Sequence, residues 1–145
     1  MGCAIADQSM AVPGGILQKT AHFCVHQDPL IPLAGFLVIA SLRHIQSISQ
    51  MQDVEYDDFS RLMKSTHRAI KAATDTEYLT LIQEENSSHF HLWFFPWTAD
   101  IVQRYGKPSL TKIREIMADQ RTQPIDQIEW DELQKSISQI KALLY

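Results

Sequence analysis

The chain has 145 residues, of which 45% are hydrophobic and 21% charged, and these values are typical of one globular domain with a sizeable core. The formal net charge of -4 provides no overall positive field, which argues against nucleic acid or an anionic membrane as a partner. No segment approaches the roughly 18 apolar residues of a membrane span, and the first residues lack the features of a signal peptide. With two cysteines, Cys3 and Cys24, we expect a reducing, cytoplasmic setting without a disulfide.

Short strands are predicted in the first part of the chain. Residues 1–14 are expected to form a flexible N-terminus. The segments 16–19 and 22–26 predict two short strands, and the apolar segment 35–41 predicts a third, central one. The loop between the second and third strands is rich in turn-forming residues, including Asp28-Pro29.

The middle of the chain predicts a long helix followed by a hairpin. Over 53–73 the apolar residues fall on one helical stripe, formed by Phe59, Leu62, Met63, Ala69, Ile70 and Ala73. Residues 77–83 then alternate like a strand, and 84–88 form a polar turn. Residues 89–95 predict the second strand of the hairpin, which we expect Pro96 to end.

The last 40 residues predict helices. Ser109 can cap a helix that reaches about Asp119, with Leu110, Ile113 and Met117 facing inward. Asp126 and Glu129 resemble a capping box, which starts a second helix with an apolar stripe made by Trp130, Leu133, Ile137, Ile140 and Leu144. That stripe can pack on a sheet or form part of a subunit interface.

The order of these elements indicates the fold class. We expect an α+β domain with an antiparallel sheet of about five strands, one long helix between strands, and C-terminal helices. Residues 15–105 form the main domain in this prediction, and residues 106–145 form a helical extension packed on it.

Two histidines separated by one residue are the chain's most informative feature. In an extended strand His89, His91 and Trp93 share one face, while Phe90 and the following alternate apolar residues occupy the other. Imidazoles presented in this way serve as metal ligands, general bases or nucleophiles, or simply lie on a solvated strand face. A zinc or iron site would need a third ligand, and no residue elsewhere has the matching motif spacing.

Three segments together resemble the histidine triad (HIT) family. The segment 89–95 (HFHLWFF) is similar to the family signature His-φ-His-φ-His-φ-φ, where φ is hydrophobic. The segment 35–45 (GFLVIASLRHI) resembles the family strand that leads to an active-site histidine, and 23–29 (FCVHQDP) resembles the strand and turn that hold the ribose. The resemblance covers roughly residues 15–105, and three positions depart from it: Trp93 replaces the last triad histidine, Phe36 replaces a histidine, and 40–42 replaces a proline-containing basic strand end.

The resemblance implies a HIT-like fold and a nucleotide hydrolase or nucleotidyl transferase. Its substrate would be a dinucleoside polyphosphate or a related nucleotide, as in the diadenosine polyphosphate hydrolase-like branch. His91 would attack the α-phosphorus to form a nucleotidyl-histidine, which water then hydrolyses. His89 and His44 would complete the catalytic cluster, while Trp93 would contact the phosphate region. The proposed chemistry requires no cofactor and no metal.

The resemblance also implies a set of binding residues and a homodimer. Asp28 or Gln27 would bond ribose hydroxyls, although Asp28 before Pro29 can equally form a turn. Ser87 or Ser88 would contact phosphate, although both also suit a turn. Candidates for a base-binding cleft, each of which can equally be plain core, are Ile16, Phe23 and Leu37.

Two other functions stay open at this point. Because an indole cannot take part in proton transfer, Trp93 is consistent with a nucleotide-binding module that has lost turnover. The alternative is a metal-dependent enzyme that uses His89 and His91 as ligands.

Overall fold

The computed structural model describes residues 12–144, so Cys3 and most of the expected flexible segment 1–14 lie outside the described residues. The helices and strands follow in the order β1 (Ile16–Lys19), β2 (Phe23–Gln27), β3 (Leu37–Ser41), the short 3-10 helix η1 (Ile48–Gln50), α2 (Asp53–Ala73), β4 (Thr76–Ile82), β5 (His91–Thr98), α3 (Ala99–Tyr105), α4 (Leu110–Thr122) and α5 (Gln127–Leu143).

The strands form one antiparallel sheet in the order β1-β2-β3-β5-β4. The helix α2 connects β3 to β4, and the predicted β4–β5 hairpin then returns the chain to the middle of the sheet. Together with the C-terminal helices, this arrangement confirms the predicted α+β class.

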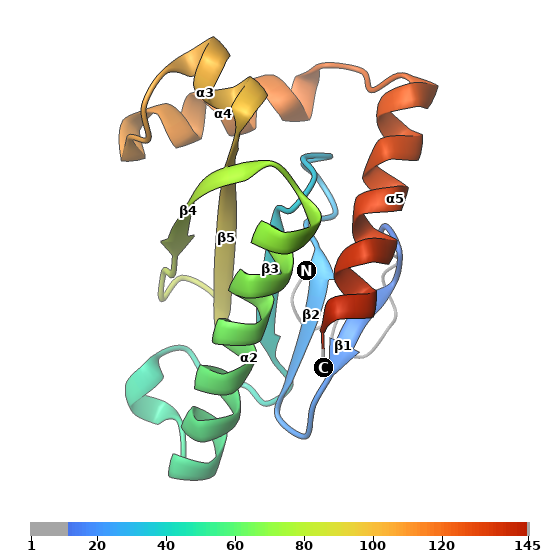
Figure 1. Ribbon diagram of the computed structural model, residues 1–145. Helices are drawn as coiled ribbons and strands as arrows, with labels where there is room; N and C mark the ends of the chain where they lie inside the picture. The colour runs from blue at the N-terminus through green and yellow to red at the C-terminus, as the bar shows by residue number, and fades with distance from the viewer. Residues whose placement is uncertain (1–11, 145) are drawn as a thin grey trace.

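The two faces of the sheet carry different residues because side chains alternate along each strand. The core face is apolar and packs against α2 and α5, and it consists of Phe23, Val25, Leu37, Ile39, Leu92 and Phe94. Figure 1 shows these two helices side by side across the sheet. The opposite face, called here the histidine face, consists of the intervening residues Cys24, His26, Val38, Ala40, His91 and Trp93.

The predicted apolar stripes of both long helices are largely confirmed. On α2, four of the six stripe residues are buried and Met63 and Ala73 pack against them. On α5, Leu133, Ile137 and Ile140 are buried, whereas Trp130 stays 37% exposed. The predicted capping box is present, with Asp126 accepting from the Glu129 backbone N–H at 2.8 Å. Burial of these stripes fixes both helices on the core face.

The helices α3 and α4 cover one end of the histidine face. Beyond Trp93, this face continues into Phe95 and Trp97, which form a second apolar cluster with residues of both helices. Figure 1 places α3 and α4 across one end of the sheet. The prediction that Leu110 faces inward is wrong, because it is the first residue of α4 and is 73% exposed; Ile116 is buried instead.

The bounds of β2 and β4 are shifted by one residue from the prediction, and β3 and β5 differ from it by more. β5 runs through Pro96. At that position β5 has passed Leu37, the first residue of β3, and pairs only with β4. A missing N–H is therefore tolerated there. β3 begins at Leu37 rather than Gly35, whose φ of 85° belongs to a turn. His89 lies before β5, so it does not share the strand face of His91.

No helix formed by residues 12–144 is both long and apolar enough to cross a membrane.

Candidate active site

The open part of the histidine face forms one wall of a cavity. The cavity has a volume of about 310 Å³, which is within the size range of small-molecule pockets. His91 and Trp93 from β5, Val38 from β3 and His26 from β2 form its floor. Its remaining lining comes from the loop after β2, the turn before β5 and helix α4, and consists of Asp28, Pro29, Leu30, Ile31, Ser87, Met117 and Arg121.

The hydrogen bonds around His91 define its tautomer. The Ser87 hydroxyl donates to the His89 backbone carbonyl, and the same oxygen lies 3.1 Å from His91 Nδ1. A hydroxyl has one proton, so the Ser87 oxygen can only accept from His91 Nδ1–H. The His91 proton is therefore assigned to Nδ1, and Nε2 keeps a free lone pair.

The environment of His91 also favours the neutral ring. Burial, the largest cause, and the nearby His26 imidazole together lower the pKa of His91 from 6.5 to about 4. The same pKa receives an opposing, upward contribution from the hydrogen bond to the His89 backbone. At neutral pH the ring is uncharged, which an imidazole needs in order to act as a nucleophile.

Trp93 stacks against the His91 ring. The two ring centroids are 5.4 Å apart and the planes are inclined by 21°. Contact with the Trp93 indole also lowers the pKa of Asp28, which burial raises by a larger amount. Trp93 therefore contacts both His91 and Asp28. Its indole N–H can only donate a hydrogen bond.

His89 and His44 form a second pair of rings beside this site. Their ring centroids are 4.3 Å apart. His89 is buried, and its Nδ1 lies 2.7 Å from the Ser41 carbonyl, which requires a proton on Nδ1. His89 Nε2 has no hydrogen-bond partner among the described residues. The structure therefore brings the predicted His44 next to His89, and the His89 backbone next to His91.

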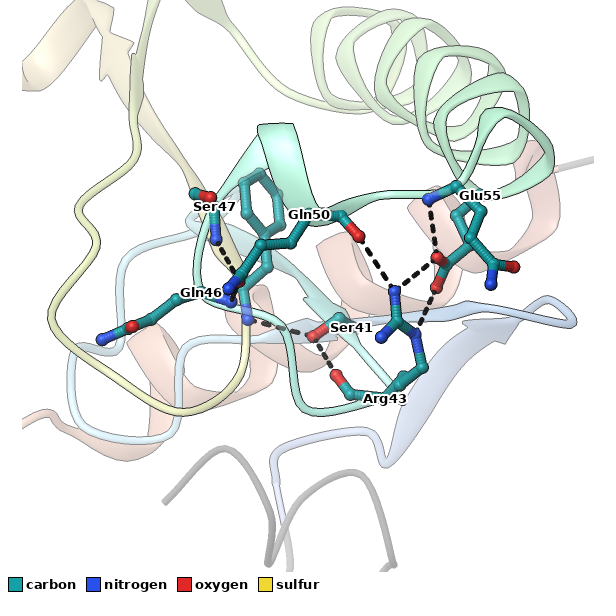
Figure 2. Close-up of polar contacts among 8 residues, drawn as sticks. Ser41, Arg43, Gln46, Ser47, Gln50 and Glu55 are labelled. Carbon is teal, nitrogen blue, oxygen red and sulfur yellow. Dashed lines mark hydrogen bonds and ion pairs between the residues drawn. The ribbon is translucent and has the colours of Figure 1, made fainter.

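His44 follows directly after an anchored segment, and Figure 2 shows the polar contacts of Ser41 and Arg43 in that segment. The Ser41 hydroxyl accepts from the Phe90 N–H at 3.0 Å and donates to the Arg43 carbonyl at 2.8 Å. The Arg43 guanidinium forms a 2.7 Å ion pair with Glu55 on α2, and that guanidinium lowers the pKa of the Glu55 carboxyl. The chain just before His44 is thus tied to Phe90, which precedes β5, and to the first turn of α2.

Ser87 and Ser88 lie in the turn before β5, but they occupy different positions. Ser87 lines the His91 cavity and also a more open hollow of about 390 Å³ that contains His44 and Ser88. Ser88 is exposed in that hollow. Among the described residues, Ser87 is therefore the only one shared by the two hollows, and it contacts His91.

Of the two predicted ribose ligands, Asp28 lines the cavity and Gln27 does not. Asp28 lines the cavity, and its Oδ1 accepts from the backbone N–H groups of Leu30 and Ile31 at 2.9 Å each. It thus has both the turn role and the position of a binding residue. Gln27 is fully buried and donates to the Leu33 carbonyl at 2.9 Å, outside the cavity lining. Phe23 and Leu37, considered for a base-binding cleft, are on the core face instead.

His26 is one of the cavity residues that the sequence did not indicate as part of a site. It is 1% exposed, its Nδ1 lies 2.8 Å from the Gln27 carbonyl, and burial lowers its pKa. In the sheet it pairs with Val38, which pairs in turn with Trp93, so the three form one row across the strands. Side chains alternate along 23–27, so the sequence places His26 on the face opposite Phe23 and Val25. Only the pairing of β2 with β3 and of β3 with β5 brings His26 near His91.

The neutral ring of His91, with its proton on Nδ1 and a lone pair on Nε2, suits nucleophilic chemistry. No group of three or more His, Cys, Asp or Glu side chains with the geometry of a metal site occurs within residues 12–144. A further cavity of about 370 Å³, between the loop 32–34 and the α4–α5 connection, has no histidine in its described lining. The His91 cavity, which is lined by two of the six histidines, is therefore the candidate active site.

Comparison with solved structures shows the fold of histidine triad proteins. The chain is similar to a hypothetical histidine triad nucleotide-binding protein from Sulfolobus tokodaii, with a TM-score of 0.67 and 16% identity over 98% of this chain and 92% of that one. A HIT-like protein involved in cell-cycle regulation from Bartonella henselae gives a TM-score of 0.66 at 12% identity, covering 97% and 92%. A zinc-bound histidine triad family protein from Mycobacterium smegmatis gives 0.63 at 13% identity, covering 97% and 94%. At these identities the likeness establishes the fold.

No family model matches the chain, and no curated protein matches it in sequence.

Proposed function

We propose that the protein is a nucleotide hydrolase or nucleotidyl transferase that acts at the α-phosphate of a dinucleoside polyphosphate or a related nucleotide. The observation that carries this proposal is the state of His91. Its ring is neutral, its Nδ1–H is held by Ser87, and its side chain lines a cavity of about 310 Å³. The shared fold with proteins described as nucleotide-binding supports the class of ligand.

The reaction uses groups that surround the cavity. The lone pair of His91 Nε2 attacks the α-phosphorus, so a P–N bond forms while the P–O bond to the leaving phosphate breaks. Water then attacks the same phosphorus, the P–N bond breaks, and the nucleoside monophosphate and neutral His91 are released. Two such steps replace one difficult displacement.

The other polar groups have supporting roles in this proposal. Ser87 and the His89 backbone orient His91, while His44 lines the neighbouring hollow with the buried His89 ring beside it. Asp28 is positioned to accept a ribose hydroxyl, and the apolar lining by Leu30, Val38 and Trp93 suits a nucleobase. Ser88 remains a candidate for a phosphate contact from the hollow.

A nucleotide-binding module without turnover is the second candidate, and Trp93 is the observation that favours it. The indole occupies the position of the last triad histidine and stacks on His91. It cannot give a proton to a leaving group, so poor leaving groups would depart slowly. Under this alternative a nucleotide raises the melting temperature without any product being formed.

Trapping the covalent intermediate tests the proposal. The full chain is incubated with a radiolabelled dinucleoside tetraphosphate or nucleoside phosphoramidate, then quenched in alkali, because phosphorus–nitrogen bonds to histidine are acid-labile. Peptide mapping is expected to place the nucleotidyl group on His91. A His67→Ala variant, changed at a histidine on α2 outside the cavity, is expected to be labelled like the parent.

Label on any other residue would contradict the assignment of the nucleophile. Nucleotide binding without label or product would support the second candidate. Activity that a chelator removes, with stoichiometric metal in the protein, would support the metal-dependent alternative. The predicted homodimer and cytoplasmic location are checked separately by sedimentation and cell fractionation.

A further inference from the structure

The cavity contains one residue from the C-terminal part of the chain that carries a full positive charge. Of the cavity-lining residues within 12–144, Arg121 is the only Lys or Arg, and Asp28 is the only acid. The chain as a whole has a net charge of -4, so an anionic ligand is not attracted by the general field. The positive charge that such a ligand needs has to come from the site itself.

Helix α4 places Arg121 in the lining of the cavity. Met117 and Arg121 are four residues apart on α4, so they lie on the same side of the helix, and both line the cavity. The same helix is fixed to the sheet by Ile113 and Ile116, which are 3% and 0% exposed. The Tyr105 hydroxyl also donates to Asp119 at 2.6 Å, which joins α3 to α4.

No ion pair among the described residues gives the Arg121 side chain a structural role. It is exposed, and within residues 12–144 it forms no ion pair, whereas Arg43 and Arg104 are both paired with acids. A guanidinium is a planar donor suited to phosphate oxygens. Its neighbours on the cavity floor are apolar or neutral, so they cannot supply this charge.

We propose that Arg121 binds the phosphate groups of the ligand and gives the cavity its preference for nucleotides over uncharged nucleosides. This inference rests on the proposed function and extends it, because it assigns the C-terminal helix α4 a part in substrate selection. Trp93 and the loop after β2 would receive the nucleoside, and Arg121 would receive the charged end.

Titration calorimetry on the full chain tests this assignment. The probes are ADP, GDP, CDP and UDP, each measured beside its own nucleoside. The Arg121→Gln variant is expected to bind the preferred diphosphate about 5-fold more weakly, the size expected for one exposed ion pair, while nucleoside binding stays unchanged. Arg121→Lys is expected to stay within about twofold of the parent, because it keeps the charge.

Arg114→Gln is the matched control, since Arg114 is an exposed arginine on the same helix outside the cavity lining. It is expected to change neither affinity. Raising the salt concentration is expected to weaken diphosphate binding in the parent more than in Arg121→Gln, because screening removes the same attraction.

The outcomes separate this inference from the proposed function. If the parent binds a diphosphate and Arg121→Gln binds it equally well, the role of Arg121 is overturned while the proposed function survives. If Arg121→Gln loses nucleoside and diphosphate affinity equally, Arg121 acts on structure rather than on charge, and the inference also fails. If the parent binds none of the probes, both proposals fail.

Discussion

The two faces of the sheet are formed by alternate residues of the same strands, yet they serve different purposes. On the core face, Phe23, Leu37 and Phe94 are 0% exposed and packed beneath α2 and α5. On the histidine face, His91 and Trp93 stay partly exposed beside a cavity. The comparison teaches that a strand period of two can separate the groups packed in a core from those that line a candidate active site.

The largest expected effect comes from His91 on the histidine face. His91→Ala removes the proposed nucleophile, so the rate of nucleotide release is expected to fall by about 10⁴-fold or more. The melting temperature is expected to change little, because the ring is partly exposed. Steady-state assays and thermal unfolding of the purified variant provide the measurement. Turnover that persists in this variant would contradict the proposal that the histidine face provides the nucleophile.

The opposite pattern is expected for a residue on the core face. Phe94→Ala leaves a hole among buried side chains, so the free energy of unfolding is expected to fall by about 3–5 kcal/mol. Urea denaturation checks this value. Below its unfolding transition the variant should still become labelled at His91, and complete loss of labelling in folded protein would show that the two faces are not independent.

Mild acid is expected to destabilise the protein through the partly buried imidazole of His91. The pKa of His91 is about 4 in the fold and near 6.5 when the chain is unfolded, so between these values only the unfolded state binds the proton. The stability present above pH 6.5 is therefore lost as the pH falls, by about 1 kcal/mol per pH unit after allowance for partial exposure. Urea midpoints at pH 7, 6 and 5 measure the slope.

The His91→Ala variant should give a shallower slope over the same range. An equal slope in parent and variant would show that His91 does not titrate as its surroundings require. His26, whose pKa burial also lowers, is expected to contribute to the slope that remains.

The smallest expected effect comes from restoring an imidazole beside His91. Trp93→His supplies a group that can donate a proton to the leaving group, so turnover of a substrate with a poor leaving group is expected to rise about 10-fold. A substrate with a good leaving group, such as nitrophenyl, should change much less. Single-turnover rates on the two substrates make the comparison, and an equal change on both would argue against a role in protonation.

Much of the fold was predictable from local patterns. The helix α2 has the predicted bounds because its stripe from Phe59 to Ile70 follows a helical period over 21 residues, and β1 has its predicted bounds as well. The end of β5 was not predictable, because Pro96 is compatible with a strand only where β5 extends past Leu37, the first residue of β3. Whether Leu110 or Ile116 faces inward was also decided by where α4 meets the sheet.

The sequence by itself determined that His91 lies on a strand whose alternate residues are apolar, with His44 and an aspartate upstream as candidate partners. Only the tertiary structure decided which groups meet that ring. Strand pairing brings His26 to it, the turn before β5 brings Ser87, and packing of α4 brings Arg121 to the same cavity. The physical reason is that side-chain direction follows from the local backbone, whereas contact between distant segments depends on burial of the whole core.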